Sequence, residues 1–331
     1  MLKTRFADFE TSRMGLGTWA IGGAGWWGDN DDKDCIDAIR AAVDGGITMI
    51  DTAPAYGFWK SEELIGKALE GIRDKVQIST KCGQVWDPPE GAFCYDFDGH
   101  RVYINISEKA IKKEIEDSLR RLRTDYIDVY MTHIQALPDF PTPVSETMGT
   151  LLKLKEEGKI LAIGVSNTNP ENLSEYLEYG KVDLIQEKYS IISRENRDAL
   201  GSLCEANDIV FQAYAPLETG LLTGKYDRGY KAPAGSARAY NPWFGEDRFA
   251  IAHDLLDKWG PLCEKYNATT GQLAIAWTLA LGDKVNVLCG ARNVGQVEDN
   301  LKGADLKLAA EDIDFMTKTA DETIIKAKGT N

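Results

Sequence analysis

Short apolar runs rich in β-branched residues alternate along this chain with longer segments that carry apolar residues at helical spacing. The clearest of the longer segments span residues 34–44, 61–70, 108–122 and 144–156, and each precedes a short apolar run. Strands are expected at residues 15–20, 47–51, 76–80, 126–132, 160–165, 182–186, 209–214 and 285–289. Regular alternation of this kind requires parallel strands joined by helical crossovers. Because the runs are almost continuously apolar, we expect both faces of the sheet to be covered.

The strand–helix units follow one another without a change of composition or a linker rich in proline and serine. This continuity favours an α/β fold in which residues 1–331 form a single domain, a closed (β/α)₈ TIM barrel, over two doubly wound domains. Residues 2–10 precede the first barrel strand and are expected to form a β-hairpin that plugs the barrel bottom. Long loops are predicted after the third and seventh strands, over residues 83–106 and 217–246, on the face where active sites of this fold lie.

Composition restricts the possible partners and location of the protein. The chain has 331 residues and a formal net charge of −14, which opposes binding to nucleic acid and to anionic membranes. Six cysteines occur without a C-x-x-C pair, and only three histidines are present, so no metal site is expected. No apolar run approaches the ~18 residues that a membrane span needs. We therefore expect a cytoplasmic protein that acts as a monomer or a small homo-oligomer.

Candidate chemistry lies at three successive strand ends. Asp51 ends the second expected strand, Lys81 follows the third, and His133 follows the fourth. Tyr56 comes shortly after Asp51, in the segment DTAPAYG. A phenol titrates near ~10, and an adjacent ammonium favours its ionised form and lowers that value. The cluster is suited to moving a proton onto an oxygen atom while hydride arrives at the neighbouring carbon.

Six motifs in a fixed order carry a resemblance to a known family. The segments DTAPAYG with SEELIGKAL, STKCG, YIDVYMTH and GKILAIGVSN are similar to successive motifs of the aldo-keto reductase superfamily. The segments AYAPLETGLLTGKY and GARNVGQVEDN are similar to its cofactor-binding motifs. GTWAIGG and GARNVGQ make the resemblance closest to bacterial reductases of the vegetative-stress and inositol-locus type. The resemblance implies NAD(P)H-dependent interconversion of a carbonyl (aldehyde, ketone or sugar) and an alcohol by hydride transfer.

The resemblance also implies roles for individual residues. Tyr56 is the general acid in reduction and the base in oxidation, Lys81 and Asp51 tune it, and His133 orients the carbonyl. The nicotinamide is held by Ser166, Asn167 and Gln186, with Tyr214 stacked on its ring. The remaining implied cofactor residues are Trp19, Pro216, Leu217, Gly220, Leu221 and Lys225 near the nicotinamide and pyrophosphate, and Gly290, Arg292, Gln296, Asp299 and Asn300 at the adenosine end.

Cofactor choice depends chiefly on Arg292, whose guanidinium suits a ribose 2′-phosphate. NADPH is therefore favoured, with NADH also open. Many members of the family have Glu where this chain has Asp299, whose side chain is one methylene shorter and so reaches less far toward the adenine amine.

The expected substrate mouth is rich in aromatic residues, with Trp26, Trp27, Phe58 and Trp86 near strand ends or in the loops after them. Such a mouth suits apolar aldehydes and also sugars, whose C–H faces stack on indoles. A sugar or polyol is the first expectation for the substrate.

Two other functions use the same residues differently. A barrel lyase would use Lys81 as a Schiff-base nucleophile, but that interpretation leaves GVSN, Tyr214 and Arg292 unexplained. A cofactor-binding regulatory subunit of the same fold would be expected to have a defective catalytic set.

Overall fold

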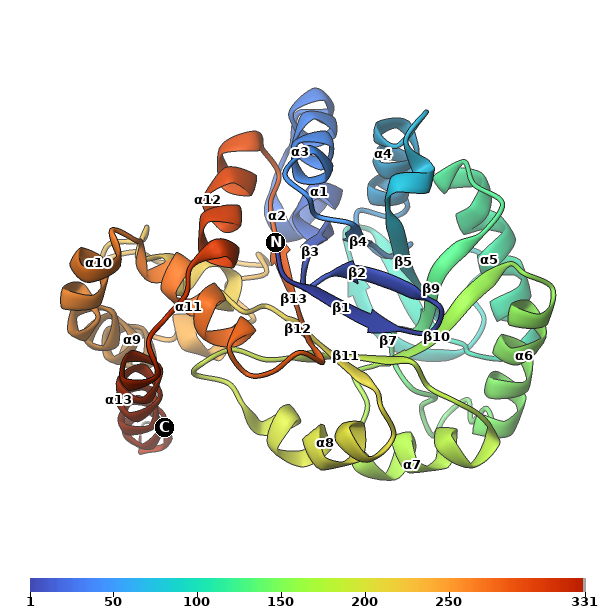
Figure 1. Ribbon diagram of the computed structural model, residues 1–331. Helices are drawn as coiled ribbons and strands as arrows, with labels where there is room; N and C mark the ends of the chain where they lie inside the picture. The colour runs from blue at the N-terminus through green and yellow to red at the C-terminus, as the bar shows by residue number, and fades with distance from the viewer. Residues whose placement is uncertain (330–331) are drawn as a thin grey trace.

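The structure, a computed structural model, describes residues 1–329, and in this part of the chain eight parallel strands close into a barrel (Figure 1). In order around the barrel these strands are β3 (Met14–Gly17), β4 (Met49–Asp51), β5 (Gln77–Cys82), β9 (Ile127–Thr132), β10 (Ile160–Ser166), β11 (Leu184–Lys188), β12 (Val210–Tyr214) and β13 (Val285–Gly290). The predicted TIM barrel is confirmed. The first strand ends earlier than expected, because the chain turns into the short helices α1 (Trp19–Gly22) and α2 (Ala24–Trp27).

Helices cover the outside of the barrel between successive strands (Figure 1). They are α3 (Asp32–Asp44), α4 (Lys60–Ala68), α5 (Glu108–Leu122), α6 (Val144–Glu156), α7 (Pro170–Tyr179), α8 (Glu195–Ala206), α11 (Thr270–Leu279) and α12 (Val294–Asp305), with the 3₁₀ turn η1 (Arg73–Lys75) before β5. A further group at one side contains α9 (Glu246–Lys258), α10 (Gly260–Tyr266) and α13 (Ala310–Lys328). Among residues 1–329, no helix combines the length and apolar character needed to cross a membrane.

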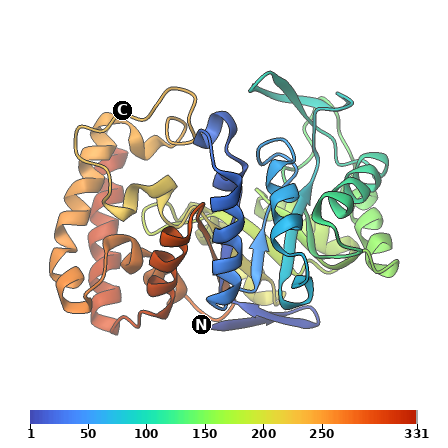
Figure 2. The ribbon, with the colours of Figure 1, turned by 90° about the horizontal axis from the view of Figure 1, so that it is seen from above.

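An N-terminal hairpin closes the bottom of the barrel. Strands β1 (Lys3–Phe6) and β2 (Phe9–Ser12) pair in antiparallel fashion. Phe6 is buried against a cluster inside the barrel that includes Met49, Val129 and Leu184. Seen from above, this hairpin lies at the opposite end of the molecule from the long connections that follow β5 and β12 (Figure 2). The predicted plug is confirmed.

The connection after β5 is a small antiparallel sheet, where an irregular loop was expected. Its strands are β6 (Gln84–Val85), β7 (Ala92–Phe97) and β8 (His100–Ile104), in the order β6-β8-β7. Asp98 and Gly99 join β7 to β8 with φ of 49° and 79°. This pair of left-handed residues makes the tight turn that fits the twist of a hairpin.

The connection after β12 contains the 3₁₀ turns η2 (Glu218–Thr223) and η3 (Pro242–Phe244). The buried carboxylate of Glu218 accepts from Ser190 at 2.6 Å and from Asn241 at 2.8 Å. The indole N–H of Trp243 donates to Ser193 at 3.1 Å. Both ends of this connection are therefore fixed. Its middle is largely exposed but is joined to α2 where the Ala237 N–H donates to the Trp26 main-chain oxygen at 3.0 Å.

Candidate active site

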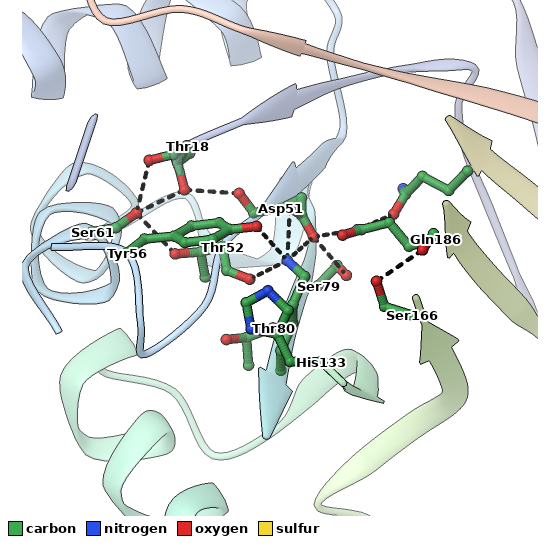
Figure 3. Close-up of polar contacts among 12 residues, drawn as sticks. Thr18, Asp51, Thr52, Tyr56, Ser61, Ser79, Thr80, His133, Ser166 and Gln186 are labelled. Carbon is green, nitrogen blue, oxygen red and sulfur yellow. Dashed lines mark hydrogen bonds and ion pairs between the residues drawn. The ribbon is translucent and has the colours of Figure 1, made fainter. Parts of the chain in front are cut away.

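Four polar side chains meet at the carboxyl ends of β4, β5 and β9. Asp51 ends β4, Lys81 lies near the end of β5, and His133 follows β9. The Lys81 ammonium donates to the two carboxylate oxygens of Asp51 at 2.9 and 2.8 Å. It also donates to the Thr52 main-chain oxygen at 2.7 Å and to the Tyr56 phenol oxygen at 3.1 Å. The His133 ring lies edge-on to the Tyr56 ring, with 5.8 Å between ring centres (Figure 3).

The turn after β4 directs Tyr56 toward this cluster. Gly57 has φ of 66°, and a Cβ added to it would lie 2.1 Å from the main-chain oxygen of Gly22. Only a glycine allows this close approach between the Tyr56 turn and α1. The buried hydroxyl of Ser61 lies 2.7 Å from that of Thr18 and 2.8 Å from that of Thr52, so α4 is tied to the same turn (Figure 3).

Burial dominates the titration of the cluster. It raises the pKa of Tyr56 well above 10, with a further increase from the Asp51 charge. Lys81 favours the phenolate, but it does not bring this pKa below its ordinary value as expected, because burial and the Asp51 carboxylate outweigh the ammonium. Burial also lowers the pKa of His133 well below 6.5, assisted by the Lys81 charge. The site therefore presents a protonated phenol beside a neutral imidazole.

A cavity of about 430 Å³ runs from this cluster along the carboxyl ends of the strands. At the cluster end it is lined by Asp51, Tyr56 and His133. Residues of the expected cofactor set line its length: Trp19, Asn167, Gln186, Tyr214, Pro216, Leu217, Gly220, Lys225, Gly290, Arg292, Gln296, Asp299 and Asn300. The cavity thus connects the expected nicotinamide end with the expected adenosine end.

Two residues expected at the cofactor do not line this cavity. Ser166 is fully buried, and its hydroxyl donates to the Gln186 main-chain oxygen at 2.8 Å. Leu221 packs in the hydrophobic core, because η2 turns its side chain inward. In this structure Ser166 supports the strand that carries Gln186, and Leu221 anchors η2.

At the expected adenosine end, two charged side chains are already engaged by other protein groups. The Asp299 carboxylate accepts from Gln272 at 2.7 Å and from Lys225 at 3.3 Å, so this ion pair joins α12 to the connection after β12. Arg292 donates through Nη1 to the Trp27 main-chain oxygen at 2.9 Å and to the Asn30 side-chain oxygen at 3.0 Å. Arg292 therefore holds the end of α2 in place.

The four expected substrate residues lie in different parts of the structure. Trp27 lines the cavity. Trp26 stacks on Phe97 with 3.9 Å between ring centres, and Phe58 lies 5.1 Å from Trp86 in an edge contact. Trp86 lines a separate cavity of about 190 Å³ beside α5. Aromatic packing between α2, the Tyr56 turn and the sheet after β5 therefore takes up part of the expected mouth.

The connection after β12 also lines the cavity with residues outside the cofactor and substrate sets given above. They are Ala215, Thr219, Thr223, Tyr226 and Arg238. The Arg238 guanidinium lies over the Trp27 ring at 5.3 Å and over the Tyr226 ring at 5.2 Å. Tyr226 directly follows the segment GLLTGK, which is the one sequence signal that could have found it.

A closed (β/α)₈ barrel with an Asp–Lys–Tyr–His cluster at one end of a long cavity is suited to a barrel oxidoreductase. Residues 13–321 match the Aldo/keto reductase family, and the chain belongs to this family. The predicted reaction class, NAD(P)H-dependent interconversion of a carbonyl and an alcohol, is thereby confirmed.

Individual relatives match along nearly their whole length. The chain is 45% identical over 316 residues to the NADH-specific methylglyoxal reductase of Escherichia coli, covering 95% of this chain and 96% of the relative. It is 36% identical over 326 residues to an aldo-keto reductase of Bacillus subtilis, covering 97% of this chain and 94% of the relative. The solved glycerol dehydrogenase AKR11B4 of Gluconobacter oxydans superposes with a TM-score of 0.86 and 34% identity, covering 99% of this chain and 97% of that one.

A solved aldo-keto reductase from Klebsiella pneumoniae, in complex with NADPH, superposes with a TM-score of 0.71. It is 25% identical, and the match covers 96% of this chain and 94% of that one. The matched proteins thus include one named for NADH and one solved with NADPH.

Proposed function

We propose that the cluster is the catalytic centre and that Tyr56 gives a proton to the carbonyl oxygen during reduction. The observation that carries this proposal is the 3.1 Å contact between Lys81 Nζ and the Tyr56 oxygen, in a fully buried ion pair with Asp51. The ammonium stabilises the phenolate that remains after proton transfer. The neutral His133 ring can donate a hydrogen bond to the same carbonyl oxygen and so fix the substrate.

The same contacts disfavour the two other functions. A Schiff-base nucleophile needs a free amine lone pair, whereas the Lys81 ammonium directs its hydrogens at Asp51, Thr52 and Tyr56. A regulatory subunit needs no such arrangement, and here the arrangement is complete.

The residues along the cavity fit a nicotinamide dinucleotide. Gln186 lines the cavity close to Tyr56. The Tyr214 ring also lines the cavity, and its hydroxyl donates to the Asn167 side-chain oxygen at 2.8 Å. A bound nicotinamide would supply the hydride in reduction and accept it in oxidation. Lys225 adds positive charge beside the middle of the cavity, where a pyrophosphate would lie.

We propose that the protein uses both NADH and NADPH, with a discrimination below about tenfold. A guanidinium bound to phosphate is worth roughly 1.5–3 kcal/mol, but Arg292 already directs Nη1 at Trp27 and Asn30. The relative that is 45% identical is NADH-specific. Reorienting Arg292 toward a 2′-phosphate would weaken its hold on α2, which offsets the gain.

We propose small carbonyl compounds of methylglyoxal size as substrates, in agreement with the 45% identical relative. The earlier expectation of a polyol remains as a second candidate, supported by the glycerol dehydrogenase of similar fold. Cytoplasmic location and a monomer or small homo-oligomer stay predictions; the six unpaired cysteines suit a reducing compartment.

The test is turnover of the purified protein with each cofactor. Methylglyoxal and glyceraldehyde are reduced with NADH and with NADPH, and glycerol is oxidised with NAD⁺ and with NADP⁺, all followed at the absorbance band of the reduced cofactor. We expect the highest kcat/KM with methylglyoxal, and values for the two reduced cofactors within about tenfold. Absence of turnover with every pair would contradict the proposal, and a preference of a hundredfold or more would contradict its cofactor part.

A further inference from the structure

A row of buried amide side chains crosses the barrel interior from the catalytic cluster to the bottom hairpin. Gln186 on β11, Gln212 on β12 and Asn286 on β13 are partners in register on neighbouring parallel strands. Residues in register on parallel strands point to the same face of the sheet, which here is the barrel interior. All three are nearly inaccessible to solvent.

The hydrogen bonds along this row all run in one direction. Gln186 Nε2 donates to Gln212 Oε1 at 2.7 Å, and Gln212 Nε2 donates to Asn286 Oδ1 at 2.9 Å. Asn286 Nδ2 donates to the main-chain oxygen of Ser12 at 2.8 Å. Because strands in a barrel tilt against its axis, a row in register descends from the mouth toward the bottom. The row therefore ends on the N-terminal hairpin that closes the barrel.

The two ends of the row, Ser12 below and Asp51 above, together fix the orientation of every amide in it. The main-chain oxygen of Ser12 can only accept a hydrogen bond. Asn286 must therefore present its N–H₂ group to Ser12 and its oxygen to Gln212. Gln212 must in turn present its N–H₂ group to Asn286 and its oxygen to the N–H₂ group of Gln186. At the upper end, Gln186 Nε2 also donates to Asp51 Oδ2 at 2.8 Å.

Both hydrogens of the Gln186 amide are thus taken, one by Gln212 and one by Asp51. In the described part of the chain, this leaves Oε1 of Gln186 as the atom available to a ligand in the cavity. An oxygen atom accepts hydrogen bonds and gives none, so it selects a ligand group with an N–H or O–H. The nicotinamide carboxamide has such a group in its N–H₂.

We propose that Gln212 and Asn286 are positioning residues that hold Gln186 with its oxygen toward the cofactor, and so select the N–H₂ of the nicotinamide carboxamide. This inference rests on the proposed nicotinamide site. It assigns a function to residues that contact no ligand and that lie below the catalytic cluster.

The experiment compares two oxidised cofactors by quenching of tryptophan fluorescence: NAD⁺ and its acetylpyridine analogue, in which a methyl group replaces the carboxamide N–H₂. The unmodified protein is expected to bind NAD⁺ about tenfold more tightly, since the analogue leaves the Gln186 oxygen unpaired. In Gln212→Met, one N–H of Gln186 loses its acceptor and can turn to the analogue's oxygen. The ratio of the two Kd values is then expected to fall to within about twofold.

Gln212→Glu is the conservative variant. A buried carboxyl group is expected to hold its proton, so it can accept from Gln186 and donate to Asn286 as the amide does, and the ratio should stay near tenfold. Val210→Ala, two residues earlier on the same strand and fully buried, removes packing but none of the hydrogen bonds of the row, and it should also keep the ratio. If Gln212→Met does not fold, Asn286→Leu is used instead. It removes the acceptor of the Gln212 N–H₂ group and should also lower the ratio of the two Kd values.

The outcomes distinguish a failure of the proposed function from a failure of the proposed positioning role. If the unmodified protein binds neither cofactor, the proposed function fails. If it binds both and Gln212→Met or Asn286→Leu leaves the ratio unchanged, the site stands and the positioning role of the row is overturned.

Discussion

Tyr56 keeps its proton because the phenol is buried and because a phenolate would lie beside the Asp51 carboxylate. The strand-end positions of Asp51, Lys81 and His133 could be predicted from sequence, because alternating strands bring their carboxyl ends together. The direction of the Tyr56 pKa could not be predicted, because it depends on how fully the phenol is buried, and burial raises it well above 10. A sequence shows which charges are near one another but not how much solvent reaches them.

This titration predicts opposite pH dependences for the two directions of the reaction. Carbonyl reduction needs the protonated phenol, so its kcat should be flat through neutral pH and fall only above pH ~10. Alcohol oxidation needs the phenolate, so its kcat should rise with pH, by up to about tenfold per unit. The two profiles are measured with one carbonyl–alcohol pair. A reduction rate that falls between about pH 7 and 9 would contradict the raised pKa of Tyr56.

At the scale of elements, the eight strands, the four helices between residues 34 and 156 and the positions of the two long connections could be predicted, but the internal structure of those connections could not. The sheet after β5 carries one local signal that was overlooked, the Asp98–Gly99 pair between two aromatic-rich runs, which is a strong hairpin signal. The fixed ends of the connection after β12 carry no such signal. They depend on Glu218 reaching Ser190 and Asn241, residues far apart in the sequence.

The connection after β12 gives a prediction about motion. Its fixed ends, residues 217–223 and 241–244, should exchange amide hydrogen slowly with or without cofactor. Residues 225–240 include Tyr226 and Arg238 at the cavity, so cofactor binding should slow their exchange by about tenfold or more. Hydrogen exchange measured by mass spectrometry, with and without saturating NADH, makes the comparison, and the fixed ends serve as the internal control. Equal exchange of residues 225–240 in both states would show that this connection does not close over the cofactor.

At the scale of the whole molecule, the closed barrel and its plug could be predicted, because eight repeated units leave few other architectures. The contribution of buried polar groups to stability could not. Glu114 on α5 accepts from the Gly83 main-chain N–H at 2.8 Å, at the start of the sheet after β5. Burial raises the pKa of Glu114 to about 8.

A carboxyl group with a raised folded-state pKa makes stability fall as pH rises. Between about pH 4.5 and 8 the unfolded chain releases the Glu114 proton while the folded protein keeps it, and this lowers the free energy of unfolding by up to about 1.4 kcal/mol per pH unit. Glu114→Gln keeps an acceptor for Gly83 and removes the proton. Relative to the unmodified protein, the variant should therefore gain stability from about pH 5 to about pH 8, measured by urea unfolding.

Glu116→Gln, at an exposed position on the same helix, is the matched control and should show no such gain. A stability difference between Glu114→Gln and the unmodified protein that does not change with pH would mean that Glu114 is ionised in the folded protein throughout this range.

Tyr56 is proposed to transfer the proton without holding the cofactor. The most direct test is Tyr56→Phe, with kcat for methylglyoxal reduction and Kd for NADH measured on the same preparation. Loss of the phenol hydroxyl should lower kcat by ~10² to 10⁴, the usual contribution of a general acid. The Kd should change less than about threefold, because no cofactor contact is assigned to that hydroxyl. A variant that keeps nearly the full kcat would contradict the account.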